Sequence, residues 1–386
     1  MKITFPHMGY LNIPLRSFFN NLGQEVIEPP AINQHTINLG TRYAPEFACL
    51  PLKINIGNFI QAAELGANTI VMAGGIGPCR FGYYAQVQRE ILADLGINMD
   101  MIVLEPPQGG WKLLLRGLRR LTGKVSLLAI FEAGAIAWAK LKALDQLAQR
   151  VYSIRAQEIS RGSTNRIWKQ ILTHIDGAND LKAVQKAADC GYALLQGIKT
   201  QPHKEMLKVG LVGEIYTVLE PAVNLGLEEV LGSMGVEVVR SIYLSEWVIT
   251  NLVLHTFYLR DDREHYQLAA PYLDHFVGGH GIESISNTVK YARAGMDGVI
   301  HVAPLTCMPE IVAKTILPGV SLGENIPVLT LMLDEHSAEA GILTRLEAFC
   351  ELLWQRKRMP KVRRQQNKTE MELSRGKLSV AGISGH

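Results

Sequence analysis

The sequence lacks any run of about 18 uninterrupted apolar residues, the length that a membrane-spanning helix needs. Cysteine is also scarce: the five in 386 residues are an odd number at long spacings, which excludes the dense disulfide framework of a small secreted protein. The segment Met1–Pro6 contains no apolar signal region. These absences predict a cytoplasmic protein that does not enter a membrane.

Phosphate-binding loops are missing as well. The chain contains no Walker A motif and no actin-like phosphate loop, so we do not expect it to hydrolyse ATP. The run Gly74–Gly77 follows a strand-like segment but lacks the G-x-G-x-x-G spacing and a supporting acid, and we interpret it as a turn. A compact C-x-x-C motif is absent too, so a metal site would need cysteines that are distant in sequence.

Length and composition indicate more than one core. Hydrophobic residues make up 47% of the chain and charged residues 19%, and 386 residues exceed one ordinary domain. Gln355–His386 carries nine Lys or Arg against two Glu, and we expect this basic tail to be solvated and disordered rather than bound to nucleic acid. We expect an N-terminal α/β domain, a helical bridge, a C-terminal α/β domain and the tail, over residues 1–110, 111–205, 206–355 and 356–386.

Strand-like and helical patterns alternate in the first and last thirds of the chain, as in a doubly wound parallel sheet. The expected strands lie at 2–5, 25–27, 69–72, 99–104, 209–212, 236–239, 298–303 and 328–332. From 111 to about 200 only helical patterns occur. We expect Asn33–Glu46 to be a polar loop, Leu219–Met234 to be one helix, and 251–276 to be largely helical.

Three cysteines lie on loops beside prolines, and two of these loops leave strands directly. Cys79 follows the strand-like run 69–72, Cys307 follows 298–303, and Cys49 lies between Pro45 and Pro51. Ligands in open α/β sheets bind at the carboxyl ends of the strands. We therefore predict that the three sulfurs converge between the two α/β domains. The remaining two, Cys190 and Cys350, follow helical patterns and are predicted to be buried and unliganded.

Three converging thiolates can hold a [4Fe–4S] cluster with one iron left without a cysteine, or zinc with water or histidine as the fourth ligand. Spacing alone leaves both groups open, together with unliganded thiols. Glu214, Glu335 and His336 lie at strand ends and are candidates for proton transfer, or else loop charges at a domain interface.

Two further features have less specific interpretations. The run Gly278–Glu283 opens a helix whose amides could meet a phosphate or carboxylate, or it is a plain glycine turn with a helix cap. His301 lies inside a strand and is expected to be a core histidine.

The segments around the three loop cysteines resemble the 2-hydroxyacyl-CoA dehydratase superfamily. These segments are Pro45–Lys53, Gly77–Tyr84 and Pro304–Pro309. The nearest branch is the dehydratase-like part of proteins described as CoA-substrate-specific enzyme activases, which the segment Asp334–Phe349 also resembles. The resemblance runs from about residue 1 to residue 358.

This resemblance implies two flavodoxin-like domains around a [4Fe–4S] cluster held by Cys49, Cys79 and Cys307. In such proteins a separate ATP-hydrolysing activator supplies an electron at low potential, the cluster passes it to a CoA thioester, and the ketyl radical eliminates water. The implied partners are that activator, a second dehydratase-like subunit or a second copy of this chain, and a CoA thioester. The loop cysteines are too few for the six of a double-cubane centre.

Three hypotheses follow. The chain is an iron–sulfur enzyme of the dehydratase or reductase type, or its catalytic subunit; it is a cluster-bearing electron carrier; or it is a zinc-binding or metal-free interaction protein. The sequence does not name a substrate.

Overall fold

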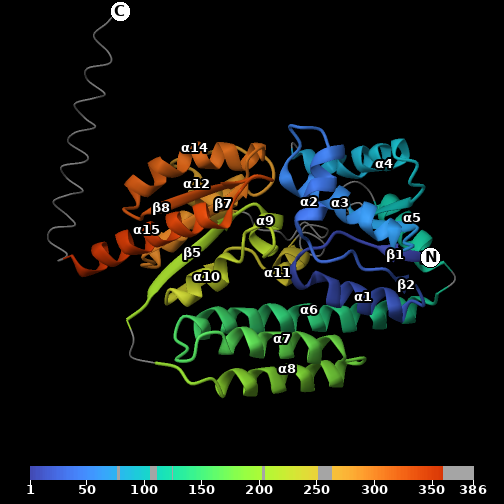
Figure 1. The fold of residues 1–386 in the computed structure, drawn as a ribbon, viewed down its shortest axis with the longest axis horizontal. Coiled ribbons are helices and arrows are strands. Elements are labelled where there is room, and N and C mark those ends of the chain that lie inside the picture. The colour runs from blue at the N-terminus through green and yellow to red at the C-terminus, as the bar shows by residue number, and fades with distance from the viewer. Residues whose placement is uncertain (76–78, 105–110, 124, 202–204, 251–262, 360–386) are drawn as a thin grey trace, which may run out of the picture.

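The computed structural model describes residues 1–75, 79–104, 111–123, 125–201, 205–250 and 263–359 (Figure 1). Three expectations fall partly or wholly outside these residues: the end of the glycine-rich turn at 76–78, a helix over 251–262, and the tail from residue 360. For residues 111–115 the structure describes the backbone alone. Among the residues described, no helix is both long enough and apolar enough to cross a membrane.

The fold is α/β with two four-stranded sheets, and every strand pair in both sheets is parallel. The first sheet has the order β2-β1-β3-β4 and the second the order β6-β5-β7-β8. Each sheet therefore has a switch point between its first and third strands, where ligands of such sheets bind. The strands are β1 (Lys2–Thr4), β2 (Glu25–Val26), β3 (Thr69–Ala73), β4 (Asp100–Leu104), β5 (Leu207–Gly213), β6 (Val236–Arg240), β7 (Gly298–Pro304) and β8 (Val328–Leu333).

Helices cover both faces of the first sheet. On one face, α1 (Asn12–Asn21) and α5 (Trp111–Thr122) bury side chains such as Phe19 and Leu121. On the other, α3 (Leu50–Glu64) and α4 (Tyr84–Asp94) pack their apolar residues against β3 and β4. Short 3-10 turns over Gly9–Leu11 and Arg80–Tyr83 precede α1 and α4.

The expectation of a polar loop at 33–46 is wrong, because α2 (Gln34–Tyr43) forms there. Asn33 and Thr36 form a capping box, which satisfies the amides of the first turn. Packing stabilises the rest: a Cβ atom on Gly40 would lie 1.8 Å from the carbonyl oxygen of Lys53, so glycine lets α2 approach α3 closely. Tertiary packing thus overrides the low helix propensity of this segment.

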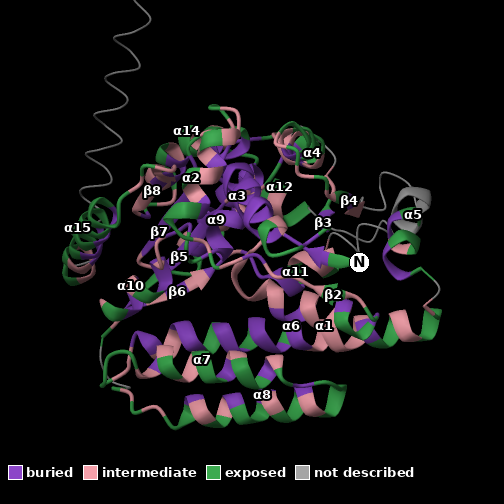
Figure 2. Ribbon diagram, turned by 45° about the vertical axis from the view of Figure 1, so that its right-hand side comes forward, coloured by how far each residue is buried: buried purple, intermediate pink, exposed green. Residues whose placement is uncertain are grey.

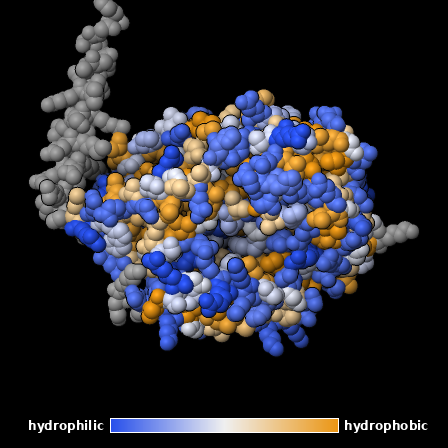
Figure 3. All heavy atoms as spheres, viewed as in Figure 1, coloured by the Kyte–Doolittle hydropathy of each residue, from blue (hydrophilic) through white to orange (hydrophobic). Residues whose placement is uncertain are grey.

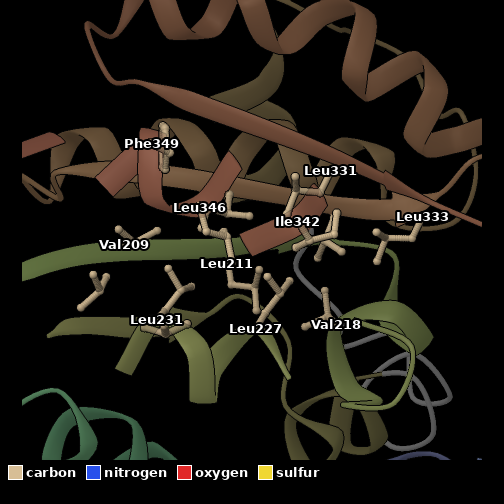
Figure 4. Close-up of a cluster of buried hydrophobic side chains, with 14 of the residues drawn as sticks. Val209, Leu211, Val218, Leu227, Leu231, Leu331, Leu333, Ile342, Leu346 and Phe349 are labelled. Carbon is tan, nitrogen blue, oxygen red and sulfur yellow. The ribbon is translucent and has the colours of Figure 1, made fainter. Parts of the chain in front are cut away.

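The second sheet is covered in the same way. On one face lie α9 (Ile215–Leu219), α10 (Leu227–Ser233) and α15 (Glu339–Arg358), whose apolar side chains meet those of β5 in Figure 4. The opposite face carries α13 (Gly281–Arg293) and α14 (Met308–Gly323), with α12 (Arg263–Ala269) packed outside them. A short helix, α11 (Leu244–Val248), follows β6.

The single helix expected over 219–234 is instead two helices, α9 and α10. The side chain of Asn224 donates hydrogen bonds to the carbonyl oxygens of Thr217 and Val218, which caps the end of α9. Leu225 and Gly226 then adopt positive φ angles of 58° and 66°, so the backbone turns before α10 begins. Side-chain capping of this kind competes with helix continuation.

A layer of three helices lies along one side of the two α/β units, shown below them in Figure 1. These helices are α6 (Leu127–Arg155), α7 (Ser163–Asp176) and α8 (Leu181–Gln196). The first of them, α6, contacts α1 in the N-terminal unit and β6, α10 and α11 in the C-terminal unit. The helix α5, which begins at the expected boundary of 111, packs on β4 instead of joining this layer.

The most buried helix of the molecule is α3, whose residues from Leu50 to Ala62 are all buried (Figure 2). Leu50 and Ile54 belong to the apolar cluster of the second sheet, whereas Ile56 and Phe59 belong to that of the first. The helix therefore packs between the two α/β units, with Cys49 at its start. On the face drawn in Figure 3, hydrophilic side chains cover most of the surface and apolar residues are interspersed between them.

Candidate functional site

The three loop cysteines occupy the same local position, directly before the first turn of a helix. Cys49 is the N-cap of α3, Cys307 is the N-cap of α14, and Cys79 precedes the 3-10 turn that leads into α4. All three have extended backbone angles, and Pro51 and Pro309 stand in the first turns of α3 and α14. Proline there has no amide hydrogen to lose and presets the helical φ angle, so the sequence fixes where these helices begin.

Arg80 joins the three cysteine loops. Its guanidinium donates one hydrogen bond of 3.2 Å to the carbonyl oxygen of Phe47, two residues before Cys49, and another to the carbonyl oxygen of Thr306, one residue before Cys307. Because Arg80 itself follows Cys79, one side chain holds loops from three distant parts of the chain. The rigid fork of arginine suits this double contact.

The three thiols lie close enough to influence one another. Burial raises the pKa of Cys49 to about 12, and the negative charges of Glu214 and Cys79 add to the rise. Burial also raises the pKa of Cys307 far above its usual range, with further contributions from Glu214, Glu310 and Cys49. Without a bound cation these thiols stay protonated at neutral pH, so metal binding would release protons.

The thiol of Cys79 is half-buried, and burial raises its pKa as well. The backbone amide of Phe81 and the charge of Arg80 act in the opposite direction. A backbone amide in the first turn of the following helix hydrogen-bonds to each of the three sulfurs and acts to lower its pKa: Leu52 at Cys49, Phe81 at Cys79 and Glu310 at Cys307. Such contacts favour the thiolate, which is the form that binds a metal.

Glu214 follows β5, and its carboxyl group interacts electrostatically with all three cysteines. Burial raises the pKa of its carboxyl group, although the amides of Tyr216 and Thr217 and the hydroxyl of Thr217 donate hydrogen bonds to it. The residue before it has to be glycine, because a Cβ atom on Gly213 would lie 1.8 Å from the carbonyl oxygen of Val302. That close approach places Glu214 beside the carboxyl end of β7.

Behind Cys307 lies a fully buried pair that sequence reasoning did not identify as part of the site. The Glu310 carboxylate contacts His301 Nε2 at 2.8 Å and accepts a hydrogen bond of 2.9 Å from Ser284 Oγ, in each case through Oε2. Its other oxygen, Oε1, is buried and has no hydrogen-bond partner among the described residues. Few buried polar atoms in proteins lack a partner, so this oxygen is an exception. His301 is a buried histidine as expected, but it contacts this site.

Glu335 and His336 are not brought together with the cysteines by any contact among the described residues. Glu335 lies after β8 and forms an ion pair of 2.5 Å with Lys53 of α3, which links the two α/β units. Burial alone would raise the pKa of Glu335, but the hydrogen bond and the charge of Lys53, together with a backbone hydrogen bond, outweigh burial and lower the pKa. His336 is exposed, and its backbone amide donates to Asp334.

The two helix cysteines differ from each other. Cys350 is buried on α15, as predicted, whereas Cys190 is exposed, so the prediction of burial is wrong for Cys190. The buried face of α8 consists of Val184, Ala188, Gly191 and Leu195. Cys190 lies two positions after Ala188, which puts it on the opposite side of the helix.

The donor set can be compared with two kinds of metal centre. Within the described ranges, no group of three or more His, Cys, Asp or Glu side chains is close enough to hold a single metal ion. A tetrahedral zinc site needs all its sulfur ligands at about 2.3 Å from one atom. In a [4Fe–4S] cluster each cysteine binds a different iron, so the sulfurs stand farther apart. Cys49, Cys79 and Cys307, from three separate loops, supply the ligand type that the second kind of site takes.

Large apolar side chains are exposed around the same three loops. They are Phe47 near Cys49, Tyr83 near Cys79, and Leu305, Met308 and Ile311 near Cys307. We call these five residues the apolar rim. Large apolar side chains that remain exposed beside a site are candidates for contact with a partner.

Comparison with known proteins gives no relatives: no family model matches the chain, and no curated protein is significantly similar to it.

Proposed function

We propose that this chain is a cytoplasmic iron–sulfur protein of the 2-hydroxyacyl-CoA dehydratase type, built from two flavodoxin-like domains. Cys49, Cys79 and Cys307 hold a [4Fe–4S] cluster that serves low-potential electron transfer to a CoA thioester or a similar substrate. One observation carries this proposal: the guanidinium of Arg80 hydrogen-bonds to both of the other cysteine loops, and so links cysteine-bearing loops from both domains.

The charges around the cysteines fit an electron donor of low potential. The carboxylate of Glu310 influences Cys79 and Cys307 electrostatically, and Arg80 is a cation that opposes it at Cys79. Negative groups close to a cluster make the addition of an electron less favourable, and so they lower its reduction potential. Thioester reduction requires such a potential.

Glu214 is the best-placed proton donor among the candidate residues. Burial raises the pKa of its carboxyl group, so it keeps its proton to a higher pH than an ordinary glutamate. A carboxyl group that keeps its proton can donate it to an oxygen on which negative charge develops. Glu335 is instead engaged by Lys53, and its role is to hold the two domains together.

The apolar rim is where we expect the ATP-hydrolysing activator to approach. Phe47, Tyr83 and Leu305 lie close in sequence to Cys49, Cys79 and Cys307, and are 72%, 74% and 48% exposed. A partner that covers these side chains buries apolar surface and comes within short range of the cysteines. Cluster-loaded protein should bind ATP negligibly by itself, and tight ATP binding to the isolated chain in calorimetric titration would contradict this division of labour.

The direct test is anaerobic purification or reconstitution, followed by analysis of iron and acid-labile sulfide. We expect equal amounts of both, about four of each per chain. Zinc, or neither element, would contradict the proposal. Turnover with an activator, ATP and a panel of CoA thioesters then separates an enzyme from the alternative of an electron carrier, which would accept electrons but convert no substrate.

A further inference from the structure

The first turns of α6 are apolar and strongly exposed. Over residues 127–138 the only charged side chain is that of Glu132. Leu127, Leu128 and Phe131 are 85%, 67% and 75% exposed, and the exposed fraction of Leu127 is the highest of any large hydrophobic side chain described. Their spacing puts these three residues, which we call the α6 tip, on one side of the helix. Scattered apolar residues are common on protein surfaces, but three within one turn form a patch.

The layer of three helices leaves this end of α6 uncovered. α6 has 29 residues, whereas α7 and α8 have 14 and 16, and its N-terminal end extends past both of them in Figures 1 and 2. The apolar cluster shared with α7 and α8 includes Leu144, Leu147 and Val151 of α6, all from its second half. Near the tip, a Cβ atom on Gly134 would meet nothing within 4 Å. Packing within the layer therefore does not explain why the tip is apolar.

The charges on the chain segment that leads to the tip are all of one sign. From Arg116 to Phe131 every charged residue is Lys or Arg. Arg116 and Arg119 of α5 are exposed and form no ion pair with any residue that the structure describes. Arg120 is half-exposed and pairs with Asp100 at 2.6 Å. At least two cations on this surface thus have no protein counter-ion among the described residues.

A tight turn holds the basic end of α5 close to the α6 tip. α5 ends at Thr122 and α6 begins at Leu127, a distance that even an extended chain limits to about 18 Å. The amide of Val125 donates to the carbonyl oxygen of Thr122 at 3.0 Å, which shortens this distance further. The hydroxyl of Ser126 then accepts a hydrogen bond from the amide of Ala129 and caps α6. Exposed arginines and exposed apolar side chains therefore share one corner of the molecule.

This combination favours a lipid surface over a second copy of the chain. A symmetric contact between two such corners would bring arginines of the same charge together, with only Glu132 to offset them. Anionic lipid headgroups instead supply negative charge to the arginines, and the boundary below the headgroups accepts apolar side chains. A projecting helix end also suits a deformable lipid surface, which needs no matching groove.

We propose that the corner formed by the end of α5 and the α6 tip binds the surface of a membrane that contains anionic lipids. The tip enters the boundary between headgroups and acyl chains, and Arg116 and Arg119 contact the lipid phosphates. The contact is peripheral, with the rest of the chain in water. It does not depend on a bound cluster, so metal-free protein serves for the test.

Sedimentation of the full chain with vesicles tests the proposal. The vesicles consist of phosphatidylcholine alone or with about one third phosphatidylserine. Wild-type protein should bind the anionic vesicles and bind them less at about 0.5 M than at about 0.05 M salt, because salt screens the arginines. The double variant Leu127→Ser, Phe131→Ser should lose about tenfold or more in affinity. Arg116→Gln with Arg119→Gln should lose roughly fivefold or more at low salt. Leu181→Ser is the matched control, since Leu181 is 52% exposed at the start of α8 and should bind as wild type does.

The charge of Glu132 gives a prediction of opposite sign. Its carboxylate lies next to Phe131 in the sequence and is exposed, so it repels anionic headgroups, and Glu132→Gln should bind the anionic vesicles more tightly. Every variant keeps the basic tail, so a difference from wild type belongs to the corner. Circular dichroism checks that each variant is folded; if the double apolar variant is not, the arginine pair and Glu132→Gln decide.

Three results would overturn the proposal. Wild-type protein does not bind phosphatidylserine vesicles, or folded corner variants bind them as tightly as wild type does, which would assign the binding to the tail or another surface. In the third, light scattering without lipid shows a wild-type dimer that Leu127→Ser with Phe131→Ser converts to a monomer. A second copy of the chain would then cover the α6 tip.

Discussion

Arg80 donates a hydrogen bond from its guanidinium to the backbone carbonyl oxygen of Thr306, 226 residues further along the chain. The contact joins the loop that follows the third strand of the first sheet to the equivalent loop of the second. A second bond from the same guanidinium reaches Phe47. The relative positions of Cys49, Cys79 and Cys307 thus depend on one side chain.

Arg80→Ala should separate the cysteine loops. Hydrogen bonds from a charged group stabilise a protein by about 1–3 kcal/mol, so we expect a loss of free energy of unfolding in that range in the metal-free protein, together with a several-fold loss of bound iron. Arg80→Lys should recover only part of both, because one ammonium group does not match the fork of arginine. Chemical denaturation and iron analysis measure the two effects.

Arg89→Ala is the control for this change. Arg89 also donates a side-chain hydrogen bond, but its partner is Gln86 on the same helix. We expect its removal to leave the iron content unchanged and to alter the free energy of unfolding by less than about 0.5 kcal/mol. Full iron content in Arg80→Ala would show that the loops are positioned without Arg80.

The five cysteines should divide into three and two when each is replaced. Cys49→Ser, Cys79→Ser and Cys307→Ser each remove one thiolate from the proposed cluster, and we expect each to lose most of its iron and sulfide. Cys190→Ala should match wild type, because Cys190 is exposed on α8. Cys350→Ala should keep its iron and lose about 1 kcal/mol of stability, since it creates a small cavity beside Met234. Loss of iron in Cys190→Ala or Cys350→Ala would instead favour a larger cluster with more than three cysteine ligands.

Much of this architecture could be predicted from the sequence, and the reasons for the rest are physical. The strands before Cys79 and Cys307 were predictable, because parallel strands covered on both faces consist of apolar, β-branched residues. Sequence reasoning did not predict the reciprocal hydrogen bonds that join the first strand of each sheet to the residue before the third strand. These bonds link Lys2 with Asn68 and Lys208 with Asp297, so the geometry repeats although the second residue differs.

Sequence reasoning did not identify the contacts that complete the site, because they join residues of different helices and strands. Glu310 and His301 are nine residues apart and meet only because β7 and α14 are adjacent in the fold. The start of α13 approaches Pro309, because Cβ atoms on Gly279 and Gly281 would lie 3.1 Å and 2.8 Å from it, and this contact also joins segments that are distant in sequence.

Gly213→Ala should disturb the site from the backbone. Gly213 has a φ of 141°, and a Cβ atom there would lie 1.8 Å from the carbonyl oxygen of Val302, so both strain and a backbone clash result. We expect a loss of about 4 kcal/mol or more in the free energy of unfolding. Gly226→Ala is the control, because Gly226 also has a positive φ but its Cβ would meet nothing within 4 Å. Gly226→Ala should reduce the free energy of unfolding by about 1–2 kcal/mol. Equal losses in the two variants would mean that the backbone shifts to relieve the clash with Val302.

The last prediction concerns Glu220, which joins the first strand to the second α/β unit. Its carboxylate lies 2.9 Å from His7 Nδ1 and accepts hydrogen bonds from the amides of Gly9 and Ala222. Burial alone would raise the pKa of Glu220, but these donors together outweigh it and hold the pKa below its ordinary value. The ionised form is therefore the one that the fold stabilises.

The sign of the pH dependence follows from that lowered pKa. The contribution of Glu220 to stability is fully present above the pKa of an unfolded glutamate, about 4.3, and is lost as pH falls through the lower pKa of the folded state. Glu220→Gln should reduce the free energy of unfolding by about 1–3 kcal/mol at pH 7, and the difference from wild type should shrink as the pH is lowered below about 4. Urea denaturation across this range measures it. Glu25→Gln is the control, since Glu25 forms only an exposed ion pair with Lys2 and should change stability by less than about 1 kcal/mol. A difference for Glu220→Gln that stays constant with pH would show that the carboxylate charge is not what stabilises this contact.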